Sequence, residues 1–96
     1  MKRSDAKPIG DMIRQVMREQ GLESPLNEYR LIQSWSDVLG RTIASYTTRL
    51  FIKNQVLYVQ LTSPALRQEL MMGRELLIRK LNQTVGAQVI TNIVFQ

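Results

Sequence analysis

Apolar residues recur at helical spacing near the start of the chain. Between residues 8 and 20 they follow the order i, i+3, i+4, i+7 and i+8, at Ile9, Met12, Ile13, Val16 and Met17. This spacing places them on one stripe of an amphipathic helix. Pro8 is typical of the first turn of a helix, and Gly21 can adopt the left-handed backbone conformation that ends one. The pattern predicts a helix over residues 8–20, preceded by a flexible end at residues 1–7.

A second helical pattern covers residues 24–39. Ser24 and Pro25 suit the N-cap and the first turn, and Gly40 suits the end of the helix. Apolar side chains recur inside it at intervals of three or four residues, at Leu26, Tyr29, Ile32, Trp35, Val38 and Leu39. We therefore expect a second helix that turns this stripe toward the core.

Several other side chains are expected in the core. Residues 41–46 predict a short helical turn with Ile43 and Ala44 facing inward, and Trp35 lies at helical spacing, which is typical of a core tryptophan. Flexible methionine fills irregular gaps in cores, and we assign that role to Met12, Met17, Met71 and Met72. Met71 and Met72 are adjacent and cannot both point inward, so one of them is a candidate for an adaptable partner surface.

Residues 48–53 and 56–61 alternate as strands around Asn54-Gln55, which predicts a tight β-hairpin. The turn sets a register that pairs Lys53 with Val56, Phe51 with Tyr58, and Arg49 with Gln60. Because side chains alternate between faces, the core face receives Leu50, Ile52, Leu57, Val59 and Leu61. The opposite face receives Arg49, Phe51, Lys53, Val56, Tyr58 and Gln60.

A long helix and a third strand complete the pattern. Ser63 and Pro64 predict the start of the helix, and Gly86 predicts its end. Its apolar stripe consists of Leu66, Leu70, Leu77 and Leu81, flanked by Met71, Ile78 and Val85. Gly73 falls on the stripe, where we expect another element to approach closely. Residues 87–95 alternate and are rich in Val and Ile, which predicts a strand.

These elements predict one α+β domain over residues 8–96, in the order helix, helix, strand, strand, helix, strand. The economical packing is a three-stranded sheet with the helices on one face. If the second and third strands are parallel, their connection through the long helix should be right-handed.

Composition narrows the possible functions. The chain has 96 residues, with no Cys and no His, which excludes disulfides, zinc fingers and every nucleophile activated by histidine. It contains neither G-x-G-x-x-G nor G-x-x-x-x-G-K. We therefore expect no catalytic residues, no metal, no cofactor and no enzymatic activity.

The longest apolar run spans residues 56–59, far short of a membrane helix. With no export signal evident, we expect a cytoplasmic protein without membrane contact.

The net charge of +5 is unevenly distributed. Residues 41–80 carry seven basic and two acidic side chains, which favours a polyanion or an acidic protein as the partner. On the hairpin, Phe51 and Tyr58 could stack nucleobases while Arg49 and Lys53 hold phosphates. The alternative is an aromatic pair that covers a partly exposed sheet. A further phosphate track is possible along Arg41, Arg67 and Arg74, since the last two are seven residues apart; the alternative is a solvated helix face.

The residues also resemble a known family. The run Trp35-x-x-Val38-x-Gly40-x-x-Ile43-Ala44-x-Tyr46-Thr47 is similar to a signature of the DciA family. The strand Leu57-x-Val59, the helix entry from Ser63 to Leu70, and a closing pattern at Leu81, Asn82, Gly86, Ile90 and 93–95 resemble it too. Gln55 replaces a family glycine, and Ala65 or Leu66 replaces a tryptophan. We also expect the chain to lack the extended tail that many relatives carry.

The resemblance implies a KH-like fold and a role at the replicative helicase. Proteins of this family bind a DnaB-type helicase and DNA, here expected to be single-stranded or forked, without being ATPases themselves. The G-x-x-G loop of nucleic-acid-binding KH domains is absent from the sequence, so the fold does not by itself imply RNA binding. Two alternatives remain at this point: a general DNA- or RNA-binding module, and a scaffold that binds only proteins. The sequence leaves the oligomeric state open.

Overall fold

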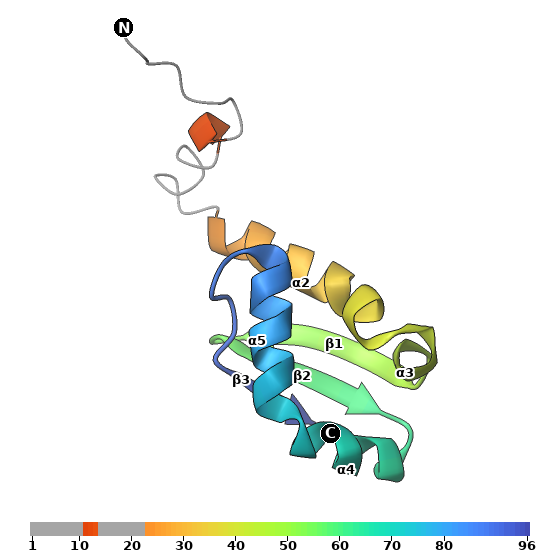
Figure 1. Ribbon diagram of the computed structural model, residues 1–96. Coiled ribbons are helices and arrows are strands. Elements are labelled where there is room, and N and C mark those ends of the chain that lie inside the picture. Colours follow the sequence, from red (N-terminus) through yellow and green to blue (C-terminus); the bar gives the residue numbers. More distant parts are fainter. Residues whose placement is uncertain (1–10, 14–22) are drawn as a thin grey trace, which may run out of the picture.

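The computed structural model describes residues 11–13 and 23–96 (Figure 1). Residues 11–13 are helical, and the rest of the helix predicted over residues 8–20 lies outside the described residues, as does the end predicted to be flexible. The described part runs from helix α2 through helix α3, strands β1 and β2, helices α4 and α5, to strand β3.

Helix α2 spans Glu23–Leu39 and helix α3 spans Arg41–Ser45. Trp35 is buried as predicted, and its Nε1–H donates a hydrogen bond to Oγ1 of Thr47 over 3.0 Å. This bond ties α2 to the start of the first strand. Ile43 and Ala44 pack against the core from α3, as predicted. Because α2 begins at Glu23, Ser24 lies inside its first turn and is not the residue that precedes the helix.

The stripe predicted for α2 is wrong at its first two positions. Leu26 and Tyr29 are exposed, whereas Leu31 is buried beside Trp35. An α-helix turns by about 100° per residue, so Tyr29 lies about 120° and Leu26 about 180° from Trp35 around the axis. The residues that share the face of Trp35 are therefore those four positions before it and three positions after it, Leu31 and Val38.

The hairpin agrees with the sequence analysis. Strand β1 spans Thr47–Lys53 and strand β2 spans Val56–Leu61. They are antiparallel, and all three predicted residue pairs are present in the register. Both turn residues have positive φ, 52° at Asn54 and 66° at Gln55, which is the geometry of a two-residue type I′ turn. Gln55 adopts this conformation although glycine is the residue that favours it.

The predicted long helix is two helices, α4 over Pro64–Met72 and α5 over Arg74–Val85. Oγ of Ser63 caps α4 by accepting from the backbone N–H of Leu66 over 3.2 Å, as predicted. Gly73 separates the helices, and a Cβ at this position would have no neighbour within 4 Å. The predicted close approach to Gly73 is therefore wrong, and the residue marks the change of helix direction seen in Figure 1.

Strand β3 spans Asn92–Phe95, so it is shorter than the predicted 87–95. The reason is the side chain of Asn82 on α5. Its Oδ1 accepts hydrogen bonds from the backbone N–H of Val89 over 2.9 Å and of Ile90 over 3.1 Å, and its Nδ2 donates to the carbonyl of Ile90 over 2.9 Å. These bonds replace strand pairing, and they hold Val89 and Ile90 in the core.

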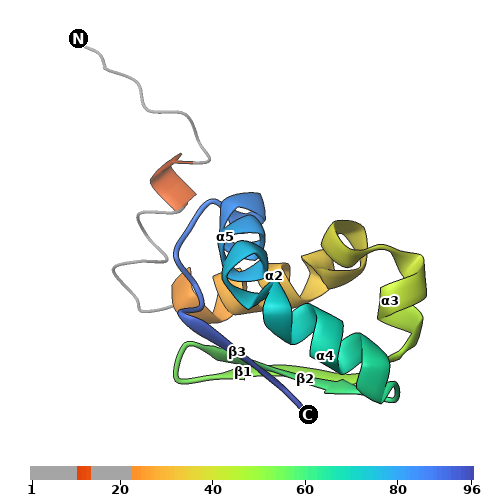
Figure 2. The ribbon, with the colours of Figure 1, turned by 60° about the horizontal axis from the view of Figure 1, so that its bottom comes forward.

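The three strands form one mixed sheet in the order β1-β2-β3, with β2 and β3 parallel. Helices α2, α4 and α5 lie on one face of this sheet (Figure 2). The core between the two layers contains Trp35, Leu57, Val59, Leu81, Ile90 and Ile93, among others. The α+β class is confirmed, and the arrangement is consistent with a KH-like description.

The methionines differ from the prediction. Met12, Met71 and Met72 are exposed and fill no gap in the core, and Met17 lies outside the described residues. Leu70 takes the core position on α4, and the two residues that follow it are carried around the helix and away from the sheet.

Candidate nucleic-acid interface

The sheet face opposite the helices forms the candidate interface (Figure 2). We call it the open sheet face and define it by the side chains that alternate away from the core on the three strands. It comprises Arg49, Phe51 and Lys53 from β1, Val56, Tyr58 and Gln60 from β2, and Asn92 and Val94 from β3. Sequence reasoning missed the two β3 residues, although the alternation around the buried Ile93 could have indicated them.

Phe51 and Tyr58 form a stacked pair at the centre of this face. Their ring centroids are 4.8 Å apart, and the ring planes differ by 9°. The guanidinium carbon of Arg49 lies 4.8 Å from the centroid of the Phe51 ring, within the range of a cation–π contact. Phe51 thus contacts a ring and a cation at once, and both contacts use the flat surface that a stacked base would need.

Tyr58 has fewer ring contacts than Phe51 among the described residues. The structure gives it one ring contact, with Phe51, and no cation over its ring. Val94 is its register partner on β3, so a small aliphatic side chain flanks it on that side. A base that stacks on Tyr58 would leave the contact between Arg49 and Phe51 intact, whereas a base on Phe51 would have to displace Arg49 or Tyr58.

The charge on the open sheet face is positive. Arg49 and Lys53 are exposed on β1, and the described strands place no carboxylate on this face. Neither cation forms an ion pair with another described residue. Both positive charges are therefore available to an anion, and Arg49 is additionally oriented by the Phe51 ring.

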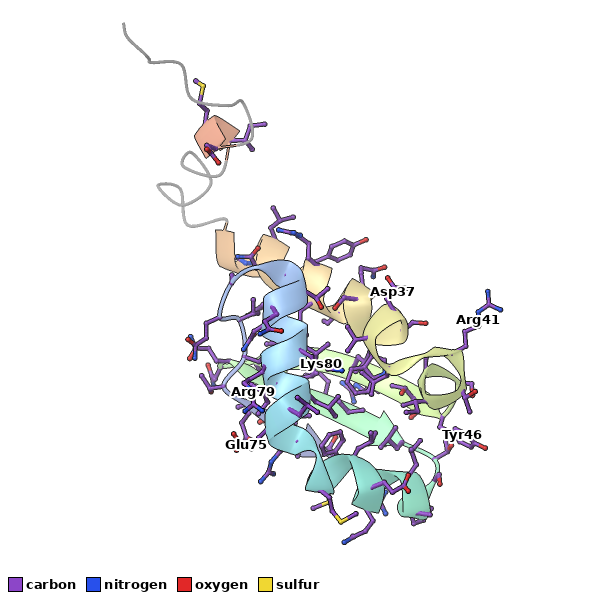
Figure 3. All side chains as sticks on the ribbon, in the orientation of Figure 1. Asp37, Arg41, Tyr46, Glu75, Arg79 and Lys80 are labelled. Carbon is purple, nitrogen blue, oxygen red and sulfur yellow. The ribbon has the colours of Figure 1, made fainter. Side chains whose placement is uncertain are left out.

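The other three candidate cations lie elsewhere. Arg41 is exposed on α3, and Figure 3 shows its side chain pointing away from the sheet. Arg67 on α4 and Arg74 on α5 are half-buried in the helical layer. Because α4 and α5 are separate helices, a spacing of seven residues does not place these two side chains on one helix face. The structure brings Arg49, Phe51, Lys53 and Tyr58 together and does not bring the other three to the same face.

Two grooves lie away from the open sheet face. The larger, of about 590 Å³, is lined by Ile78, Arg79, Asn82, Gln83, Gly86, Ala87 and Gln88. The smaller, of about 270 Å³, lies between α2, α3 and β1.

Within residues 11–13 and 23–96, no three acidic side chains gather to hold a metal ion. In the same residues, no helix is long and apolar enough to cross a membrane.

Taken together, these features define a small α+β domain whose mixed sheet is covered on one face and open on the other. The family model described as "Dna[CI] antecedent, DciA" matches residues 8–95. The chain therefore belongs to the DciA family, as the Trp35 signature predicted.

Curated relatives agree with this assignment. Each is called "UPF0232 protein" and is 28% identical to the chain over 89 residues, in Mycolicibacterium paratuberculosis (strain ATCC BAA-968 / K-10), Mycobacterium ulcerans (strain Agy99) and Mycobacterium marinum (strain ATCC BAA-535 / M). The matches cover 93% of this chain and 48% to 49% of the relatives. The chain thus spans about half the length of the curated relatives it matches.

Proposed function

We propose that this chain is a non-enzymatic accessory domain of DNA replication that binds a DnaB-type helicase and also binds DNA. The family match over residues 8–95 supports the replication role and the helicase partner. The proposed role requires the protein to work in the cytoplasm, where replication takes place.

The observation that carries the DNA-binding part is the cluster of Arg49, Phe51 and Tyr58 on the open sheet face. Single-stranded DNA offers both unstacked bases and phosphates, which suit an aromatic ring beside cations. We assign the base contact to Tyr58, whose ring carries no cation, and the phosphate contacts to Arg49 and Lys53. A forked substrate would present such a single strand next to a duplex.

The DNA-binding part is tested with a fluorescent single-stranded oligonucleotide at low and moderate salt. Binding should weaken as salt rises, because bound phosphates release counterions. Arg49→Glu and Lys53→Glu should each weaken binding by about tenfold, which is about 1.4 kcal/mol. Arg30→Glu is the matched control, since it makes the same change of two charge units at an exposed position on α2, in the helical layer. If Arg49→Glu and Lys53→Glu both bind like the original chain, the open sheet face is not the site.

The helicase part is tested by a pull-down with the DnaB-type helicase of the same bacterium. Association at micromolar concentrations is the expected result, and its absence would overturn the partner assignment. DNA binding without helicase binding would indicate a general nucleic-acid-binding module. Helicase binding without any DNA binding at low salt would indicate a protein scaffold.

A further inference from the structure

Three large apolar side chains are exposed where α4 meets α5. Met71, Met72 and Leu76 have exposed fractions of 46%, 76% and 50%. We call these three residues the elbow surface. Single exposed apolar residues are common on proteins, but a group within six consecutive positions at a change of helix direction forms a patch.

Other side chains of α4 and α5 form the core, and Met71, Met72 and Leu76 are not part of it. Helix α4 contributes Leu66 and Leu70 to the core, and α5 contributes Leu77, Leu81 and Val85. Met72 lies two residues after Leu70, which is about 200° around the helix axis. Helix α5 has its own stripe, and Leu76 lies outside it. The elbow surface is therefore an addition to a complete core, and the described residues leave it uncovered.

Charged side chains of both signs border this patch, with cations in the majority: Glu69 lies three residues before Met72, and Glu75 directly precedes Leu76. Helices α4 and α5 carry the cations Arg67, Arg74, Arg79 and Lys80 against the carboxylates Glu69 and Glu75. None of these six side chains forms an ion pair with another described residue. Leu76 precedes Arg79 and Lys80 by three and four residues, so it shares a side of α5 with them. Figure 3 shows Glu75, Arg79 and Lys80 distributed along α5.

Charge complementarity identifies the kind of partner. An apolar centre on two helices with a net charge of +2, from four cations and two carboxylates, fits an apolar segment with an excess of carboxylates around it. A second copy of the chain would bring together two surfaces that each carry a net positive charge, which disfavours self-association through this surface. The described residues of the elbow surface include no aromatic side chain to anchor it in a lipid interface. Methionine adapts its shape to a partner more easily than branched side chains do.

We propose that the elbow surface docks an amphipathic, acidic-bordered segment of the replicative helicase. This inference rests on the proposed function for the identity of the partner. The elbow surface belongs to the helical layer, and the open sheet face lies on the other side of the sheet (Figure 2). One molecule can therefore hold the helicase on one side and a DNA strand on the other.

The test compares two variants that make the same kind of change at different places. Met72→Glu puts a negative charge in the elbow surface, and Tyr29→Glu puts one at an apolar side chain of α2 that is 61% exposed. Helicase affinity is measured by biolayer interferometry with the full chain. We expect Met72→Glu to raise Kd by about tenfold or more and Tyr29→Glu to change it by less than about twofold. Single-stranded DNA binding should be equal in the two variants.

A second pair of variants tests the charge. Arg79→Glu should weaken helicase binding, and Arg79→Lys should largely preserve it. If the original chain does not bind the helicase, the proposed function fails and this inference fails with it. If the original chain binds and Met72→Glu binds equally well, only the elbow assignment is overturned. Binding to vesicles of anionic phospholipid that Met72→Glu abolishes would reassign the surface to a membrane and also overturn it.

Discussion

The open sheet face carries two cations and the elbow surface lies on helices with a net positive charge, but the two are built differently. On the sheet, two rings and a guanidinium already contact one another, so the face is organised before any partner arrives. At the elbow, the flexible side chains of Met71 and Met72 are 46% and 76% exposed, so a partner can still order them. Charge alone would not separate the two surfaces, whereas the contacts among their side chains do. A preorganised face suits repeated, similar units such as nucleotides, and an adaptable methionine-rich one can repack against a protein surface.

The largest loss of stability, and with it of both binding activities, is expected from a substitution in the core that supports both surfaces. Trp35→Ala removes a side chain that is 2% exposed and its hydrogen bond to Thr47. We expect the free energy of unfolding to fall by about 3–5 kcal/mol, which would weaken DNA and helicase binding together. Urea denaturation followed by circular dichroism measures the loss. Trp35→Phe, which keeps a ring but not the N–H, should cost less; equal stability of Trp35→Ala and the original chain would contradict the role of this residue.

A smaller loss is expected at Asn82, which supports the sheet near β3. Asn82→Ala removes three hydrogen bonds and leaves backbone groups of Val89 and Ile90 without these partners. We expect about 2–3 kcal/mol less stability in urea denaturation. Amide hydrogen exchange should speed up at Val89 and Ile90 before it does in the hairpin. An unchanged free energy of unfolding in Asn82→Ala would show that these three hydrogen bonds contribute little.

Next in size is a change confined to the open sheet face. Tyr58→Ala should weaken single-stranded DNA binding by about tenfold, within the range of about 1–3 kcal/mol for one stacked base. Tyr58→Phe keeps the ring and should bind nearly normally in a fluorescence anisotropy titration. Helicase binding should be the same for both variants, which separates this face from the elbow surface. Normal DNA affinity of Tyr58→Ala would remove the base contact from Tyr58.

The smallest change in stability is expected at Gly73, the residue between α4 and α5. The elbow surface lies where these two helices meet. Gly73 has φ −102°, which alanine can adopt, and an added Cβ would meet no atom within 4 Å. Gly73→Ala should therefore raise stability by about 0.5–1 kcal/mol by restricting the unfolded chain. Thermal unfolding measures this gain. A loss of stability would mean that the change of helix direction itself requires glycine.

The candidate site was predictable in part. The hairpin register assigned Arg49, Phe51, Lys53 and Tyr58 to one face, because alternation along two strands joined by a short turn is a local rule. That the rings stack on each other, and that Arg49 lies over Phe51, depends on side-chain rotamers that no spacing rule specifies. Arg67 and Arg74 were grouped on the assumption of one continuous helix, which the junction at Gly73 removes.

By itself, the sequence determined the α+β class, the hairpin and its register, the cap at Ser63 and the family, because these follow from patterns within a few neighbouring residues. Only the tertiary structure decided which face of α2 is buried, where the last strand begins, and that Met71 and Met72 are both exposed. Each of these depends on packing or hydrogen bonding outside the element concerned. Asn82 shortens β3 by bonding to residues seven and eight positions away, and a methionine is buried only if another element covers it.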